Sequence, residues 1–278
     1  MELASLREIK KILQKNRTSP SKGLGQNFLI SRTALSQLIG AAELKREDTV
    51  LEIGPGIGVL TLELAKRVKK LIAVEKDRKM CQILKETLEA YKNLEIINAD
   101  ILKFNHNNYK LITKNYKLVA NLPYYITSPV IRKFLEVEKP PDLMVLIVQK
   151  EVAQRICAKP PKLNLLAVSV QLYANPKIIS FVPKNSFWPK PKVDGAIIQI
   201  TQIKKDGKID NQTFFKIVKA GFSQPRKQII NNLSKRLKLN KMQAESWLKS
   251  CKIEPEQRAE TLSLSDWILL TEKFAIIK

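Results

Sequence analysis

The chain has 278 residues, of which 44% are hydrophobic and 27% charged, and its formal net charge is +23 at pH 7. This composition excludes a disordered chain, and no apolar run approaches the roughly 18 residues that a membrane-spanning helix needs. The large positive charge predicts a polyanionic partner, nucleic acid before a membrane surface.

Three cysteines, Cys81, Cys157 and Cys251, are too few for a disulfide framework and too far apart for a paired metal motif. This usage is typical of a reducing compartment, so we expect a cytoplasmic protein without a metal site. The single histidine, His106, lies in the polar stretch 105–108, where we expect a loop residue.

Residues 1–17 have apolar side chains at helical spacing among lysines and arginines, which predicts a short amphipathic helix packed on the body of the protein. An organelle-targeting segment has a similar pattern, but Glu2 and Glu8 weigh against that alternative. A glycine-punctuated loop over 21–29 follows, and then a helix over 31–42 is expected.

Strands and helices alternate in the next part of the chain. Strands are predicted over 49–53, 71–74, 94–98, 117–120 and 143–148, and helices over 60–68, 78–90 and from 127 onward. Ser128 is the predicted N-cap of the last helix and Pro129 its first residue. The alternation predicts an α/β fold, a Rossmann-like parallel sheet with helices on both faces. Prolines between 181 and 191 precede a further strand over 196–203, expected near the sheet edge.

The residues after 204–208 have helical spacing and no strand signal. We therefore predict a main domain over 1–205 and a small all-helical domain over 206–278. Between 211 and 244 there are eight basic residues and no acidic one: Lys216, Lys219, Arg226, Lys227, Lys235, Arg236, Lys238 and Lys241. A charge run is usually a solvated face, but a run of a single sign in so basic a chain favours a phosphate-binding surface.

A glycine-rich turn follows the first predicted strand, with Gly54, Gly56 and Gly58 in the sequence Glu-Ile-Gly-Pro-Gly-Ile-Gly. Such a turn lets the backbone approach a ligand closely. Glu75 ends the next strand about twenty residues later, where a carboxylate can accept hydrogen bonds from both ribose hydroxyls. A dinucleotide dehydrogenase shares these features.

Two differences favour S-adenosylmethionine over NAD or ATP. The glycine spacing departs from Gly-x-Gly-x-x-Gly, and Asp100 follows the third strand, where it can accept a hydrogen bond from an adenine amino group. Each acid alone is compatible with a solvated strand end, but together they predict S-adenosylmethionine as the cofactor.

A second motif, Asn121-Leu122-Pro123-Tyr124, follows a short apolar strand. The Asn121 side chain and the Leu122 carbonyl can accept the two N–H bonds of an exocyclic amino group. Pro123 fixes the turn, and Tyr124 offers a ring on which a base can stack. A strand end with an aromatic turn is the plainer alternative, but the cofactor motif ahead of it favours methylation of a base amino group.

These two motifs and four others resemble the ribosomal RNA adenine dimethyltransferases of the KsgA kind. The others are Gly-Gln-Asn-Phe-Leu at 25–29, Gln-Lys-Glu-Val-Ala at 149–153, Phe-Trp-Pro-Lys-Pro-Lys-Val-Asp at 187–194, and Arg226-Lys227 before Asn-Asn-Leu at 231–233. The resemblance runs in order from about residue 22 to the last helix. It implies a Rossmann-like methyltransferase domain, a helical RNA-binding domain, and N6,N6-dimethylation of two adjacent adenosines near the 3′ end of 16S RNA in the pre-30S subunit.

The resemblance also assigns site residues. Cofactor contacts are implied for Asn27, Leu29, Gly54, Gly56, Glu75, Asp100 and Asn121. The implied catalytic set is Asn121, Leu122, Pro123, Tyr124 and Phe187, and in it the rings of Tyr124 and Phe187 flank the target adenine. Gly195 and Pro225 depart from the family pattern outside the catalytic motif. We expect a monomer. Two alternatives stay open: the large-subunit RNA adenine methylases of the antibiotic-resistance type, and a non-catalytic ribosome-assembly or transcription factor of the same fold.

Overall fold

The computed structural model describes residues 3–104, 115–203 and 209–274. The chain forms two compact units, the first comprising Met1–Ala153 and Asn175–Ile203 and the second Gln154–Ala174 and Lys204–Lys278. The predicted linker at 204–208 and His106 lie outside the described residues. The second unit includes residues 154–174, whereas the predicted main domain runs without interruption over 1–205.

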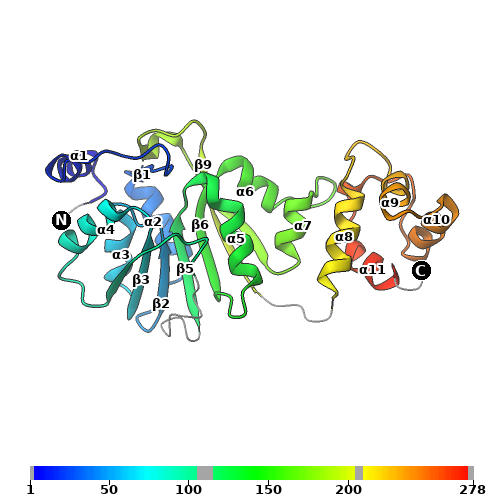
Figure 1. Ribbon diagram of the computed structural model, residues 1–278, viewed down its shortest axis with the longest axis horizontal. Coiled ribbons are helices and arrows are strands. Elements are labelled where there is room, and N and C mark those ends of the chain that lie inside the picture. Colours follow the sequence, from blue (N-terminus) through cyan, green and yellow to red (C-terminus); the bar gives the residue numbers. More distant parts are fainter. Residues whose placement is uncertain (1–2, 105–114, 204–208, 275–278) are drawn as a thin grey trace. The chain divides into compact units, whose positions relative to one another are not determined.

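A seven-stranded sheet in the order β4-β3-β2-β5-β6-β9-β7 forms the centre of the first unit (Figure 1). The strands are β2 (Thr49–Ile53), β3 (Lys70–Glu75), β4 (Leu94–Asn98), β5 (Tyr116–Asn121), β6 (Leu143–Gln149), β7 (Asn175–Val182) and β9 (Gly195–Thr201). The first five are parallel, and β9 and β7 are antiparallel additions. The predicted α/β fold is confirmed.

The edge of the sheet agrees with the sequence prediction, with one strand added. The strand expected near the edge, now β9, lies between β6 and β7, and β7 takes the edge itself. The sequence analysis did not predict β7, whose second residue is Pro176. A proline cannot donate to a sheet ladder, so it weakens the strand signal but is tolerated at an edge.

Helices pack on the two faces of the sheet. They are α1 (Leu6–Lys15), α2 (Arg32–Ala41), α3 (Val59–Ala65), α4 (Arg78–Thr87) and α5 (Thr127–Glu136), while α6 (Lys150–Ile156) follows β6 directly. Side chains of α1 to α4 share one apolar core with strand residues such as Val50 and Leu71. Because strand side chains alternate, the neighbouring buried Leu51 and Ile72 face the opposite side, which α5 covers (Figure 1).

The start of α5 corrects one prediction. The N-cap is Ile126 rather than Ser128, and its side chain makes no capping hydrogen bond. A short 3-10 turn, η2 (Tyr124–Ile126), runs directly into the helix, so the backbone is already helical before Ser128 is reached. Pro129 still lies in the first turn, where its missing N–H leaves no bond unmade.

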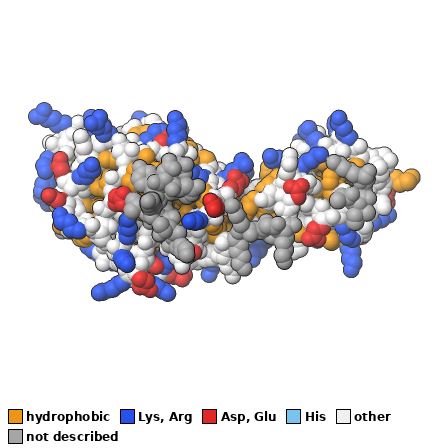
Figure 2. All heavy atoms as spheres, turned by 60° about the horizontal axis from the view of Figure 1, so that its bottom comes forward, with side chains coloured by type: hydrophobic (Ala, Val, Ile, Leu, Met, Phe, Trp, Pro, Cys, Tyr) orange, Lys and Arg blue, Asp and Glu red, His pale blue; other side chains and the backbone are white. Residues whose placement is uncertain are grey.

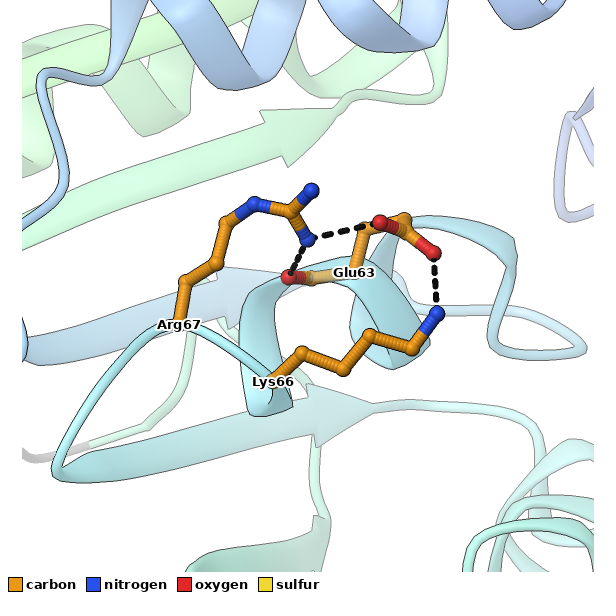
Figure 3. Close-up of polar contacts among 3 residues, drawn as sticks. All are labelled: Glu63, Lys66 and Arg67. Atoms are coloured by element: carbon orange, nitrogen blue, oxygen red, sulfur yellow. Dashed lines mark hydrogen bonds and ion pairs between the residues drawn. The ribbon is translucent and has the colours of Figure 1, made fainter.

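Three charged side chains cluster at the end of α3 (Figure 3). The Glu63 carboxylate accepts hydrogen bonds from Lys66 Nζ and Arg67 Nη1, both at 2.6 Å. Burial alone would raise the pKa of Glu63, but the hydrogen bonds and charges of the two cations outweigh it and lower the pKa. The cluster thus holds an ionised carboxylate between two cations on the last turn of the helix.

The second unit is helical. It contains α7 (Leu165–Gln171), which the sequence analysis did not predict, and α8 (Asn211–Gly221), α9 (Ile229–Leu237), α10 (Lys241–Ser250) and α11 (Leu264–Phe274) in the part predicted to be helical. Its core contains the buried Trp247, Trp267 and Phe214. A Cβ at Gly221 would lie 2.4 Å from the Trp267 ring, so only glycine fits there. The buried Asn232 side chain donates to the Gly221 carbonyl at 2.7 Å and thereby fixes α9 against the end of α8.

Candidate active site

A pocket lies at the carboxyl ends of β2, β3 and β5 in the first unit. Parallel strands bring their carboxyl ends to one edge of the sheet, which is where such folds bind ligands. All of the site residues predicted from the sequence line this pocket: Asn27, Leu29, Gly54, Gly56, Glu75, Asp100, Asn121, Leu122, Pro123, Tyr124 and Phe187. The structure therefore brings together four motifs and two strand-end acids that are far apart in the sequence.

The glycine turn after β2 has the backbone conformation that its sequence predicts. Gly54 and Gly56 have φ angles of +67° and +58°, a region that residues with a side chain rarely adopt. A Cβ at Gly56 would also lie 2.9 Å from the Phe28 ring. The turn thus needs glycine for its own geometry and for close packing against the N-terminal loop.

Glu75 connects the end of β3 to the glycine turn. Its Oε2 accepts a hydrogen bond from the Gly56 N–H at 3.0 Å, and its Oε1 accepts one from the Asp77 N–H at 2.8 Å. Burial raises the pKa of Glu75, and these two hydrogen bonds oppose the rise because they stabilise the ionised form. The carboxylate is therefore fixed in position, and each oxygen keeps further lone-pair capacity toward the pocket.

Asp100 provides a second carboxylate in the pocket wall. Its Oδ2 lies 2.9 Å from Lys76 Nζ, and its Oδ1 accepts a hydrogen bond from the Leu102 N–H at 3.0 Å. The hydrogen bond with Lys76 lowers the pKa of Asp100, so the group is ionised at neutral pH. Among the described residues that line the pocket, Lys76 is the single cation, and it is paired with this acid.

Asn121 at the end of β5 is oriented by the N-terminal loop. Its Nδ2 donates a hydrogen bond to the Asn27 carbonyl at 3.0 Å, and Asn27 Nδ2 in turn donates to the Gly25 carbonyl at 3.1 Å. Because the amide nitrogen is engaged, the amide oxygen is the end of Asn121 that can accept hydrogen bonds from a ligand.

A two-stranded pairing places Phe187 in the pocket. The strand β1 (Phe28–Leu29) pairs with β8 (Phe187–Trp188), with Leu29 opposite Phe187. The Ile30 N–H extends this pairing by donating to the Ser186 carbonyl at 2.8 Å. The N-terminal loop that orients Asn121 therefore continues into the strand that pairs with β8 and positions Phe187.

Tyr124 lines the pocket with a partly buried ring, and its hydroxyl is buried without a hydrogen-bond partner among the described residues. Burial, with added repulsion from the charges of Asp194 and Glu151, raises the pKa of Tyr124 to about 12. The residue is thus a neutral phenol whose ring, rather than its hydroxyl, is the feature available to a ligand.

A model of the family described as ribosomal RNA adenine dimethylase matches residues 17–275. The chain belongs to this family. It is 47% identical to ribosomal RNA small subunit methyltransferase A of Dehalococcoides mccartyi, over 90% of this chain and 86% of that protein. It is 40% identical to the protein of the same name from Clostridioides difficile, over 97% and 96% of the two chains. This rRNA adenine dimethylase is therefore a methyltransferase.

Solved structures agree on the fold. The 23S rRNA methyltransferase ErmE superposes with a TM-score of 0.73 at 25% identity, over 90% of this chain and 100% of that chain. A dimethyladenosine transferase from Plasmodium falciparum also gives 0.73, at 26% identity over 90% and 98% of the two chains. The overall fold therefore does not separate a 23S rRNA methyltransferase from a dimethyladenosine transferase.

The structure of this dimethylase adds a pocket residue that the sequence analysis did not assign a role. Glu52 in β2 lines the pocket, is 1% exposed, and its Oε2 has no hydrogen-bond partner among the described residues. Burial raises the pKa of Glu52 to about 8, the charge of Glu75 adds to the rise, and Thr61 opposes it. The sequence held a clue, since an acid in an otherwise apolar buried strand is unusual.

Gln26 was also missed as a structural residue. Its side chain donates to Asp77 Oδ2 at 2.9 Å and accepts a hydrogen bond from the Ser21 N–H at 2.8 Å. It thereby connects the N-terminal loop to the start of α4, next to Glu75. Gln26 belongs to the motif Gly-Gln-Asn-Phe-Leu at 25–29, but nothing in the spacing of that motif predicts this contact.

Proposed function

We propose that this rRNA adenine dimethylase modifies the small ribosomal subunit, forming N6,N6-dimethyladenosine at two adjacent adenosines in the 3′-terminal hairpin of 16S RNA with S-adenosylmethionine as methyl donor. The observation that carries the proposal is the single pocket that joins Glu75 and Asp100 to Asn121 and Tyr124. The small-subunit target is supported by the names of relatives at 40–47% identity, whereas ErmE is at 25%.

The residues present fit S-adenosylmethionine better than a dinucleotide. Glu75 is suited to the ribose hydroxyls and Asp100 to an adenine amino group, because both are fixed acceptors. A pyrophosphate would require cations or open N–H groups, but the Lys76 ammonium is paired with Asp100 and the Gly56 N–H already donates to Glu75. Asn27, Leu29, Gly54 and Gly56 would complete the cofactor site.

Asn121 and the backbone carbonyl of Leu122 would accept the two N–H bonds of the target amino group. This draws the nitrogen lone pair out of conjugation with the adenine ring and makes the nitrogen a better nucleophile. S-Adenosylmethionine supplies, when bound, a methyl group on a sulfonium that leaves as a neutral thioether. The proton can depart after transfer, so the protein's part in catalysis is chiefly positioning.

The rings of Tyr124 and Phe187 would hold the extruded adenine between them. Stacking of this kind stabilises a base by roughly 1–3 kcal/mol, which offsets the cost of removing it from its helix. Pro123 supports the arrangement, since its carbonyl accepts the Ile126 N–H at 3.1 Å and closes the turn that carries Tyr124.

The helical domain, predicted over 206–278, would bind RNA. The eight basic residues between 211 and 244 are all exposed, and Figure 2 shows Lys and Arg side chains spread over the face in view. Such a surface suits the phosphates of rRNA. We further propose that the protein acts as a monomer in the cytoplasm. Among the described residues, no helix has the length and apolar character needed to cross a membrane.

The test is transfer of labelled methyl from S-adenosylmethionine to small subunits that lack the modification, with large-subunit RNA assayed in parallel and the product identified by mass. Two neighbouring dimethyladenosines near the 3′ end of 16S RNA are expected. Label in large-subunit RNA alone would favour the resistance-type methylase, and tight binding without any label would favour a non-catalytic assembly factor.

A further inference from the structure

Tyr125 is an aromatic residue at the rim of the pocket with 56% of its surface exposed. An isolated exposed aromatic residue is ordinary on a protein surface, and Phe181 on β7 is exposed to a similar extent, 50%. Tyr125 differs from Phe181 in two respects: it lines the active-site pocket, and its ring packs against a loop that contains a glycine.

Gly25 holds one side of the Tyr125 ring. A Cβ at Gly25 would lie 3.3 Å from both Cδ1 and Cε1 of Tyr125, and the residue has a φ of +62°. The loop is itself fixed, because the Gly25 N–H donates to the Lys22 carbonyl at 3.0 Å and the Gly25 carbonyl accepts from Asn27 Nδ2. The ring therefore rests on a supported backbone, while more than half of the residue stays open to solvent.

The surroundings of Tyr125 have the composition of a nucleotide-binding surface. Leu102, on the same pocket, is 38% exposed, and the exposed Lys76 also lines this pocket with its ammonium on Asp100. Exposed aromatic rings are the surfaces on which single-stranded RNA stacks its bases.

We propose that Tyr125 stacks on the base of the nucleotide next to the target adenosine and so positions the RNA strand outside the pocket. The inference rests on the proposed function, in which Tyr124 stacks on the target itself. Tyr124 and Tyr125 are consecutive residues of the turn η2 and both line the pocket, so a base that follows the target out of the pocket can meet the second ring. Tyr125 would act as a positioning residue that contacts the substrate away from the reacting atoms.

The first test compares Tyr125→Ala with Tyr125→Phe and with Phe181→Ala, which removes an equally exposed ring outside the pocket. With unmodified small subunits, Tyr125→Ala should raise KM roughly 10-fold while kcat and the affinity for S-adenosylmethionine stay unchanged. Tyr125→Phe and Phe181→Ala should behave as wild type. An unchanged KM in Tyr125→Ala, or an equal rise in Phe181→Ala, would overturn the inference.

The second test uses small subunits assembled on RNA in which one of the two adenosines, each in turn, is abasic and the other remains the target. On at least one of these substrates, the wild-type enzyme should show a KM raised by the same factor as the one that Tyr125→Ala shows on intact subunits. On that substrate, Tyr125→Ala should show no additional rise in KM. If the effects of the abasic site and of Tyr125→Ala on KM multiply, the stacking contact is refuted. Absence of methylation by the wild-type enzyme on intact subunits would instead refute the proposed function on which the inference rests.

Discussion

The side-chain amide of Asn121 donates a hydrogen bond to the backbone carbonyl of Asn27 at 3.0 Å, across 94 residues of sequence. This bond orients the residue that ends β5 by means of the loop that precedes β1. It also determines which end of the amide is available to a substrate, because the nitrogen is engaged and the oxygen can still accept. The proposed catalytic acceptor is thus positioned before any ligand arrives.

Replacement of Asn121 by alanine should lower methyl transfer at saturating cofactor by at least about 100-fold, because an acceptor that positions the amino group is lost. The affinity for S-adenosylmethionine should fall by less than about 10-fold, since Glu75 and Asp100 remain. Single-turnover transfer and cofactor titration measure the two effects separately. Asn93→Ala is the control, because Asn93 also holds backbone carbonyls through its amide but lies outside the pocket. Full activity in Asn121→Ala would contradict the mechanism.

Tyr124→Phe should retain nearly all activity, whereas Tyr124→Ala should lose roughly 10- to 100-fold in kcat/KM. The hydroxyl has no hydrogen-bond partner among the described residues, so its removal costs no bond, while loss of the ring removes the stacking surface. Steady-state kinetics on small subunits, with thermal unfolding as a check of integrity, makes the comparison. The reverse order of activities would rule out stacking as the main role of this residue.

Asp100→Asn should weaken S-adenosylmethionine binding roughly 10-fold and leave the transfer rate at saturating cofactor close to that of wild type, because a charged acceptor is replaced by a neutral one. Lys76→Met provides a matched control, since it breaks the same 2.9 Å ion pair but keeps the carboxylate. If both variants lose the same affinity, the ion pair rather than the carboxylate is what binding requires.

Glu52→Gln should make the stability of the folded protein less sensitive to a rise in pH. Burial raises the pKa of Glu52 to about 8, above its value in the unfolded chain, so the folded state holds an extra proton between these two values. Its contribution to stability is present at low pH and is lost as the pH rises through about 8. The variant should therefore match wild type near pH 5 and exceed it by up to a few kcal/mol near pH 9. Parallel pH profiles of the two proteins would contradict the assignment.

Glu63→Gln is the matched variant at the surface, and its effect on the free energy of unfolding should have the opposite pH dependence. Lys66 and Arg67 lower the pKa of Glu63, so its stabilisation is present above the pKa of the unfolded chain and disappears as the pH falls through the folded value. The variant should lose about 0.2–1 kcal/mol at neutral pH and nothing in strong acid. Denaturant unfolding at a series of pH values measures both profiles, and a loss that persists in strong acid would show that packing rather than charge is responsible.

The strands and helices of the first unit could be predicted because their residue patterns are local. The strand over 49–53 and the strand over 94–98 coincide with β2 and β4, since apolar side chains bounded by turn residues define both. The edge strand β7 and the N-cap of α5 could not be predicted. Pro176 weakens the strand signal of β7, and the 3-10 turn that displaces the cap depends on the geometry after Pro123.

The sequence by itself predicted which residues meet at the pocket, because the glycine turn, the two strand-end acids and the Asn-Leu-Pro-Tyr motif each follow a parallel strand, and parallel strands end at one edge of their sheet. Only the tertiary structure decided how the side chains are held. The pairing of Leu29 with Phe187, the bond from Asn121 to Asn27 and the burial of Glu52 all join segments distant in the chain or depend on the environment around a residue. Contacts of this kind leave no period or spacing in the sequence, so they come into view only once the chain is folded.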